Sequence, residues 1–513
     1  MSEPAAPATS HKEILRSTSI IGVASVINIV ISIVRTKILA LLVGPAGVGL
    51  MGLFNRVLGT AITLAGMGLG HSGVRQIAAA SAKTAEGDVA ASASAATDLA
   101  RVRQALWFAN LGLGLVAMVA VWLFREPIAA AALDDASRAS EVGWLGVGVF
   151  FALVSASQTA LLQGLRRIAD LAKVTILGTF VGSAVGVVLV WQLGVAGIVW
   201  MLIAAPAASA LVAAERVARL PRPIRLPLHW PALTREWRVM FDLGAPIMAA
   251  TLVTGICQLV TRSSITDALG IEATGHFEAA WSISMTYVGL VLAAMSTDYY
   301  PRLTAAITDR SASNRLANEQ AEVALLLAVP VLLGLITFAP LVTSLLYSSA
   351  FAPTTEILRL QVVGDILKVA SWPMGFILLA RGNNRLHLLT ELGWNLVYLV
   401  TLWVLLPRIG LAASGVAFVA AYLVYLVTIS LIVRRLQGFV PARRVVVHLL
   451  VAFVAALGVL ALSYLDAWLA LGVGILMTSM LGFYSSRMLL GMLGLGGRLG
   501  ALIARIRRIL RIR

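Results

Sequence analysis

Long apolar runs recur along the whole chain and leave few folds open to it. Each is close to the roughly 20 residues that a helix needs to cross the hydrocarbon core of a bilayer. In lipid every backbone N–H and C=O must be bonded within the segment, so runs of this length predict helices. Fourteen such runs fall at about residues 18–43, 48–70, 105–124, 144–164, 174–192, 198–214, 241–263, 277–298, 321–346, 358–380, 387–406, 415–433, 446–465 and 468–490. The sequence therefore predicts an all-α polytopic membrane protein with about 14 transmembrane helices.

Composition agrees with a chain that is solvated by lipid. Hydrophobic residues make up 59% of it and charged residues 12%, with a mean hydropathy of +0.91. A soluble domain carries about 25% charged residues. The single cysteine, Cys257, excludes an internal disulfide, and the six scattered histidines have no metal-ligand spacing. We expect neither a metal nor a cofactor.

Lys and Arg residues are distributed unevenly between the two sides of the membrane. With the N-terminus in the cytoplasm, 31 of the 40 fall on the cytoplasmic side, and the opposite loops hold Arg125, Arg138 and Arg408. This positive-inside bias predicts cytoplasmic N- and C-termini and a place in the bacterial inner membrane. It also accounts for the net charge of +16 without a nucleic-acid partner. The basic tail at 498–513 has helical spacing of Leu/Ile and Arg, which favours an amphipathic helix on the anionic leaflet over a solvated tail.

An internal repeat divides the first twelve runs into two groups of six. The Pro- and Arg-rich stretch at 215–240 separates them. A shift of 226 residues carries one polar helix face onto another, namely Ser25, Asn28, Ser32 and Thr36 onto Thr251, Thr254, Gln258 and Arg262. We expect an N-terminal lobe at 1–214, a cytoplasmic linker at 215–240, a C-terminal lobe at 241–434 and two additional helices at 446–490. Two lobes related by a pseudo-twofold repeat are typical of transporters with a site between them.

Cations stand on both arms of the predicted hairpin RTKILALLVGPAGVGLMGLFNR (35–56). Arg35 and Arg56 lie equally far from the turn, about 12 Å below the outer end of their spans at 1.5 Å per residue. Arg262 is expected at a similar depth in the second lobe. An arginine facing lipid costs at least about 2.5 kcal/mol, so such residues usually face a bundle interior or a watery cavity. Lys37 is nearer the surface, where it could instead extend to the interface.

The side chains around these cations predict the class of ligand. No acidic residue lies in the first two spans, and Asn, Ser and Thr accompany the arginines. Such a cavity favours an anionic, hydroxyl-rich ligand, because the arginine fork donates two hydrogen bonds to paired phosphate oxygens. The candidate substrate-binding residues are Arg35, Arg56, Arg262, Lys37, Lys368, Asn28 and Gln258.

Acidic residues in the later spans are candidates for ion coupling. They are Asp365, Glu278, Asp242 and Asp298. For Asp365 the alternative is a structural pair with Lys368, one turn away. For the other three the alternative is a place at the membrane interface.

The sequence of residues 17–78 strongly resembles the first helix pair of bacterial O-antigen and polysaccharide flippases, in the multidrug/oligosaccharidyl-lipid/polysaccharide exporter superfamily. Further similarities are GPAGVGLMG (44–52), STDYYPRL (296–303) and LLARGNNR (378–385). The resemblance covers roughly residues 14–440. It implies two six-helix lobes with alternating access that move a polyprenyl-pyrophosphate-linked oligosaccharide to the periplasmic leaflet. It also implies cavity-lining basic residues on the first, second and seventh helices, matched here by Arg35, Arg56 and Arg262.

Several functions compete with this one. Many close relatives have twelve helices, whereas fourteen also resemble the lipid II flippases of the same superfamily. A cation-driven drug exporter would prefer an acidic cavity. A membrane glycan polymerase, ligase or glycosyltransferase needs acid and base groups at the outer face. The longest outer loop (125–143) is short and Ala-rich, with only Glu126, Asp134, Asp135 and Glu141. We expect a transporter rather than an enzyme. The expected partners of this transporter are membrane lipids, a polysaccharide polymerase and a chain-length regulator.

Overall fold

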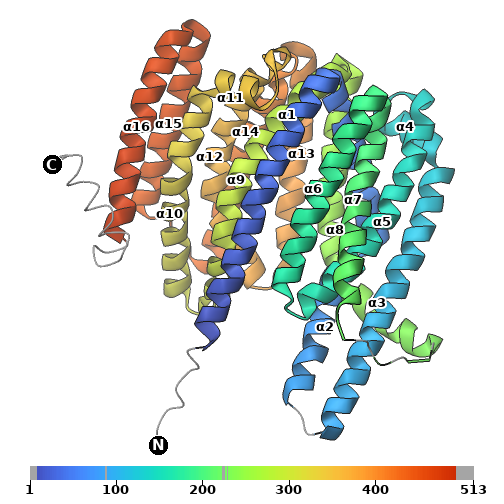
Figure 1. Ribbon diagram of the computed structural model, residues 1–513. Coiled ribbons are helices and arrows are strands. Elements are labelled where there is room, and N and C mark those ends of the chain that lie inside the picture. The colour runs from blue at the N-terminus through green and yellow to red at the C-terminus, as the bar shows by residue number, and fades with distance from the viewer. Residues whose placement is uncertain (1–8, 87–88, 222–223, 225, 228, 493–513) are drawn as a thin grey trace, which may run out of the picture. The chain divides into compact units, whose positions relative to one another are not determined.

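The computed structural model describes residues 9–86, 89–221, 224, 226–227 and 229–492, so the predicted amphipathic tail lies outside the described residues. Helices make up almost all of the described chain (Figure 1). Their bounds are α1 (Thr9–Gly66), α2 (Leu69–Glu86), α3 (Val89–Leu123), α4 (Arg125–Leu133), η1 (Ala136–Arg138), α5 (Ala139–Gly164), α6 (Ile168–Leu193), η2 (Gly194–Ala196), α7 (Gly197–Ala218), α8 (Trp230–Leu269), α9 (Ile271–Ala306), α10 (Arg310–Thr337), α11 (Ala339–Leu346), η3 (Ser349–Phe351), α12 (Thr354–Ala380), α13 (Asn384–Ile409), α14 (Ala412–Gln437), α15 (Arg443–Leu465) and α16 (Ala467–Met492).

Thirteen of the fourteen predicted spans fall on a single helix or on one of the two parts of α1, although α3, α8 and α9 extend well beyond the predicted runs. Ten described segments are long and apolar enough to cross a membrane, and two of these, Ala24–Gly66 and Ile168–Ala218, each contain two spans. The predicted runs 241–263 and 277–298 lie in α8 and α9. The run 321–346 is divided, because α10 ends at Thr337 and the short α11 follows. The all-α polytopic fold predicted from hydropathy is therefore confirmed.

The described chain forms two compact units. Unit 1 comprises residues 1–275 and 346–348, and unit 2 comprises residues 276–345 and 349–513. In unit 1, α8 packs against α1, α2 and α3, so this unit extends past the linker at 215–240. The predicted six-plus-six division rests on the sequence repeat and stays a prediction.

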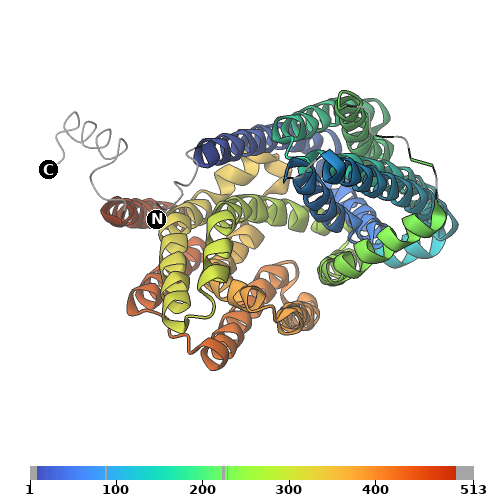
Figure 2. The same ribbon diagram turned by 90° about the horizontal axis from the view of Figure 1, so that it is seen from below.

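Unit 1 is built around α5. This helix packs on α3, α7 and α1, while α6 lies along α7 and the first part of α1 (Figure 2). Both parts of α1 contribute to one apolar cluster in this unit, through Leu39 on one side of the turn and Leu50 and Phe54 on the other. Because these side chains share one cluster, α1 is folded back on itself.

In unit 2 the last two helices are packed onto the body of the unit. Both α15 and α16 contact α10, and α15 also contacts α12 (Figure 1). At Gly474 of α16 the backbone passes so close to the Thr337 side chain that a Cβ would overlap it. The two additional helices are thus held by specific packing in unit 2.

The fold-back in α1 occurs at Gly44, whose φ of 62° and ψ of −169° interrupt the helix before Pro45. We call residues 9–43 the first arm and residues 45–66 the second arm. The same conformation recurs 226 residues later at Gly270, with φ 88° and ψ 168°, between α8 and α9. Left-handed positions also recur 216 residues apart, at Arg166 and Gly382 and at Gly194 and Gly410. The pair Gly44 and Gly270 thus repeats the backbone geometry at the 226-residue offset of the sequence repeat. The other two pairs repeat it at an offset that is ten residues shorter.

Replacement of Gly44 by alanine is expected to lower the free energy of unfolding by about 1–3 kcal/mol, because this region of φ/ψ space is almost restricted to glycine. Gly59→Ala is the matched control on the second arm. It is helical, and a Cβ there meets no atom within 4 Å. Thermal unfolding of the two purified variants in detergent measures the difference. Equal stability of both variants would contradict the strained turn.

Candidate functional site

The second arm of α1 runs antiparallel to α8, and glycine contacts fix this pair near both ends, through the turn after α1 and the start of α9. At one end Gly68 and Gly244 meet backbone to backbone. At the other end Gly49 packs on the backbone of Ile271 and Gly275. Between them Gly255 of α8 lies beside Thr60, where a Cβ would be 3.6 Å from the hydroxyl oxygen. These contacts fix the register between the two helices.

This register brings together residues that are about 200 positions apart in the sequence. It places Arg56 level with the turn of α8 that carries Gln258 and Arg262. The Arg262 side chain is fully buried, and its Nη1 donates a hydrogen bond of 3.0 Å to the Gln258 carbonyl oxygen. In this state Arg262 is held by its own helix, so contact with a ligand requires the surroundings of Arg262 to open.

The first arm adds polar atoms that the protein leaves without partners. Arg35 Nε and Asn28 Oδ1 are buried and make no hydrogen bond with the described residues, and neither does Gln258 Oε1 on α8. Lys37 is half-buried two residues after Arg35. Buried donors and acceptors without partners cost roughly 1–3 kcal/mol each, so a ligand or water that satisfies them would bind favourably.

The electrostatics of this region are one-sided. No Asp or Glu occurs between residues 14 and 85, and within 241–263 of α8 only Asp242 is acidic, with its side chain exposed. Arg35, Arg56 and Arg262 therefore create a positive field in an otherwise largely apolar part of the unit. A low-dielectric environment strengthens that field, which favours an anion over a cation as the ligand.

Unit 2 contains a second polar cluster in its interior. Asp365 on α12 is fully buried, and its Oδ2 accepts a hydrogen bond of 2.5 Å from the Ser284 hydroxyl of α9. Lys368 Nζ lies 3.2 Å from the Met285 sulfur and 5.7 Å from the ring centroid of Tyr422. In the described part of the chain no nitrogen–oxygen contact within 4 Å joins Lys368 to Asp365. The two side chains still lie close enough for their charges to interact, so the alternative of a structural pair stays a prediction.

Further members of this cluster were not among the predicted residues. Glu391 on α13 lies near Lys368 and the Tyr425 hydroxyl. Gln361, one turn before Asp365, is fully buried, and both of its amide atoms lack partners among the described residues. Glu391 is an acid inside a predicted span, and that alone could have indicated it, because ionisable residues in membranes are usually functional.

The predicted residues fall into separate groups. Six of the seven candidate substrate residues lie in unit 1, and Lys368 lies in unit 2. Asp242 is exposed at one end of its predicted span, Glu278 is half-buried near the start of α9, and the Asp298 side chain lies outside the described residues. Among the ion-coupling candidates Asp365 alone is known to be fully buried.

The acidic loop at 125–143 has a structural role. Asp135 caps η1 through the Ser137 backbone N–H, and Arg138 bonds Asp135 at 3.1 Å and Glu141 at 3.0 Å. The hydrogen bonds from Ser137, together with the charge of Arg138, hold the pKa of Asp135 below its usual value. A carboxylate that is ionised and bonded in this way is a poor general base, which counts against a catalytic role for this loop.

A family model described as "Polysaccharide biosynthesis protein" matches residues 14–307, more than half of the chain. The chain belongs to this family. The matched region contains both arms of α1 and all of α8, so it includes every candidate substrate residue of unit 1.

Among curated proteins, the lipid III flippases of Escherichia coli K12 and Shigella flexneri are each 24% identical over 185 residues. The match covers 36% of this chain, and the chain spans only 44% of the length of these relatives. The likeness therefore concerns part of each molecule.

Solved structures extend the likeness to the whole fold. An inward closed conformation of the lipid II flippase MurJ has a TM-score of 0.66 at 14% identity, and the match covers 93% of this chain and 99% of that one. An inward-facing MATE multidrug transporter of the MOP superfamily also has a TM-score of 0.66, at 18% identity, over 80% of this chain and 94% of that one. A MOP superfamily transporter from Pyrococcus furiosus, described as having a binding pocket of reverse polarity, has a TM-score of 0.59 at 16% identity, and the match covers 82% of this chain and 95% of that one.

Proposed function

We propose that this protein flips a polyprenyl-pyrophosphate-linked oligosaccharide, such as an O-antigen, capsule or exopolysaccharide repeat unit, from the cytoplasmic to the periplasmic leaflet of the inner membrane. The observation that carries the proposal is the group of arginines in unit 1. They stand on α1 and α8, without a neighbouring acid on α1, and beside buried polar atoms that lack partners. Family membership and the similarity to lipid-linked flippases support the same class of substrate.

In this proposal Arg35 and Arg56 bind the pyrophosphate, because two guanidinium forks match its paired oxygens. Asn28 and Gln258 bond the first sugar hydroxyls through their free amide oxygens. The polyprenyl chain stays in lipid while the lobes exchange access between the two sides. Arg262 joins the site when the surroundings of its buried guanidinium open.

We further propose that the cluster around Asp365 couples this exchange to an ion or a proton. A buried carboxylate with one hydrogen bond, beside an unpartnered glutamine amide, is suited to gaining and losing a cation. Glu391 and Lys368 set the local charge balance.

A lipid II-type flippase is the second candidate. The fold match to MurJ covers 93% of the chain, against 80% for the inward-facing MATE transporter. Both candidates share the lipid pyrophosphate, so the arginine site serves either. A multidrug exporter is less favoured, because its cationic substrates would be repelled by this site.

Leaflet transfer in proteoliposomes tests the proposal. Full-length protein is reconstituted, and transfer is measured separately for a fluorescent polyprenyl-pyrophosphate oligosaccharide, fluorescent lipid II and a lipophilic cationic dye, with and without sodium and pH gradients. We expect transfer of the lipid-linked oligosaccharide and none of the dye. Faster transfer of lipid II would favour the second candidate. Dye export without transfer of either lipid would overturn the proposal.

A further inference from the structure

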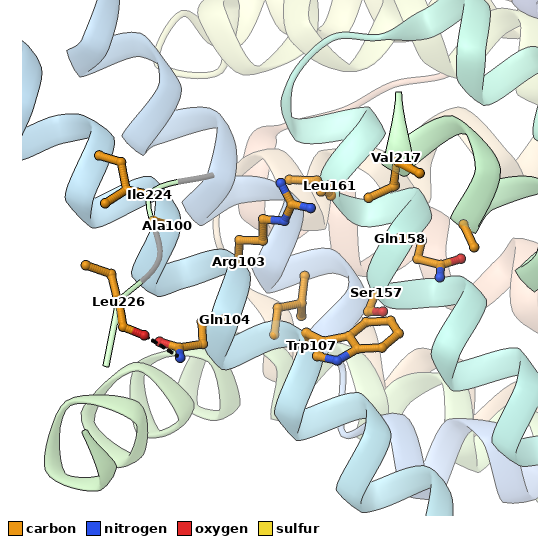
Figure 3. A pocket seen from close by; sticks show the side chains of 13 residues that line it. Ala100, Arg103, Gln104, Trp107, Ser157, Gln158, Leu161, Val217, Ile224 and Leu226 are labelled. Atoms are coloured by element: carbon orange, nitrogen blue, oxygen red, sulfur yellow. Dashed lines mark hydrogen bonds between the residues drawn. The ribbon is translucent and has the colours of Figure 1, made fainter. Parts of the chain in front are cut away.

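A cavity of about 580 Å³ opens in unit 1 among α3, α5, α7 and the segment that follows α7. Its volume is in the range of small-molecule sites, roughly 300–1,000 Å³. None of its lining residues comes from α1 or α8, so it is separate from the arginine site described above. Figure 3 shows Arg103 at its centre, with Gln104 and Trp107 from the same helix and Gln158 from α5.

Two side chains that line this cavity, Arg103 and Gln158, have polar atoms without partners among the described residues. Arg103 is half-buried and makes neither a hydrogen bond nor an ion pair with the described residues. Gln158 is only 7% exposed, and its Oε1 is buried without a hydrogen bond. A guanidinium binds an anion, whereas an amide oxygen accepts a hydrogen bond from an N–H or O–H donor. A ligand that satisfies both carries a negative group and a hydrogen-bond donor.

The remaining walls suit an amphipathic ligand. Leu161, Val217 and Ile224 make much of the lining apolar. Trp107 follows Arg103 by one helical turn toward the centre of the membrane and is 38% exposed, which is typical of the interfacial aromatic belt. The Gln104 amide donates to the Leu226 carbonyl oxygen at 3.4 Å, which holds Leu226 at the rim of the cavity (Figure 3).

The charge distribution of the sequence puts this end of α3 at the cytoplasmic surface. We propose that the cavity binds the headgroup of a phospholipid of the cytoplasmic leaflet. Arg103 binds the phosphodiester, Gln158 accepts a hydrogen bond from the terminal ammonium or hydroxyl, and an acyl chain lies along the apolar wall. This lipid site is additional to the proposed substrate site and does not depend on what the protein transports.

Lipid titration of the delipidated full-length protein tests the site, with thermal stabilisation and native mass spectrometry as readouts. Phosphatidylethanolamine, phosphatidylcholine and diacylglycerol are compared. The first two have the same net charge, but only the ethanolamine headgroup donates an N–H. We expect affinity to decrease in that order, with no specific retention of diacylglycerol.

Arg103→Gln is expected to weaken binding of phosphatidylethanolamine about tenfold, through loss of a charge-assisted contact. Arg101→Gln is the matched control, because Arg101 lies two residues away and is bonded to Asp98 instead. Gln158→Leu is a second, independent variant and should remove the preference for ethanolamine over choline while Arg103 still binds phosphate.

Three results would overturn the proposal. One is equal loss of affinity in the Arg101 and Arg103 variants, which would indicate nonspecific surface charge. Another is unchanged headgroup preference in Gln158→Leu together with unchanged affinity in Arg103→Gln. The third is binding of inorganic phosphate as tightly as phosphatidylethanolamine, which would make this a site for a free anion.

Discussion

Alanine at Arg35 or Arg56 is expected to reduce transfer of a lipid-linked oligosaccharide by roughly a hundredfold or more. Each guanidinium can give two charge-assisted hydrogen bonds to pyrophosphate, worth about 1.5–3 kcal/mol apiece, and tenfold in rate corresponds to about 1.4 kcal/mol. Lysine at either position should retain part of the activity, because it keeps the charge and loses the fork. Initial transfer rates in proteoliposomes measure the effect.

Arg125→Ala is the matched control for this prediction. Arg125 is a cation at the start of α4 that stacks 4.8 Å from the Trp122 ring centroid, and it lies on neither α1 nor α8. Its removal should leave transfer unchanged. Arg35→Ala should not lower thermal stability, since Arg35 Nε is a buried donor without a partner. If Arg35→Ala and Arg56→Ala both transfer the substrate at the wild-type rate, these arginines have only a structural role.

Replacement of Asp365 by alanine is expected to destabilise unit 2 by about 3 kcal/mol and to abolish ion-dependent transfer. The substitution removes the acceptor of the Ser284 hydroxyl and leaves Lys368 in the interior with less negative charge nearby. An uncompensated buried charge of this kind typically costs about 3–5 kcal/mol. Unfolding measured in detergent and transfer measured across an imposed sodium or proton gradient give the two readouts.

A second substitution separates stability from coupling. In the double variant Asp365→Ala, Lys368→Met the buried cation is also gone, so stability should recover while transfer stays lost. Ser284→Ala removes only the hydrogen bond and should cost about 1 kcal/mol. If the double variant is no more stable than Asp365→Ala, the two groups do not share a charge balance. If the single variant still responds to the gradient, Asp365 is not the coupling site.

The helical fold was predictable because the bilayer imposes a strong local rule. A run of twenty apolar residues can satisfy its backbone only as a helix, so hydropathy alone located most of the spans. The turn at Gly44 was predictable for a similar reason, since Gly-Pro interrupts a helix wherever it stands. The division of the run 321–346 into α10 and α11 was not, because both pieces are equally apolar.

The sites were less predictable, because they depend on which helix faces which. The sequence indicated Arg35, Arg56 and Asp365 through the cost of charge in lipid. It did not indicate that Ser284 bonds Asp365, 81 residues away, or that Gln361 is buried beside it. The contact between Lys368 and the aromatic ring of Tyr422 could not be predicted from hydrophobic periodicity either. The same periodic pattern results whether an apolar helix face packs against lipid or against a lysine.

The glycine contacts at the turn after α1, in α8 and at the start of α9 have a consequence for the tolerance of the chain to mutation. At Gly68, Gly244 and Gly275 a methyl group would overlap backbone atoms of the neighbouring segment, which cannot turn aside as a side chain can. In a saturation library these positions should accept no other residue, whereas Gly59 and Gly289, where a Cβ meets open space, should accept alanine and serine. The pattern of permitted residues would thus show where these backbone segments are in contact, without any structure being determined.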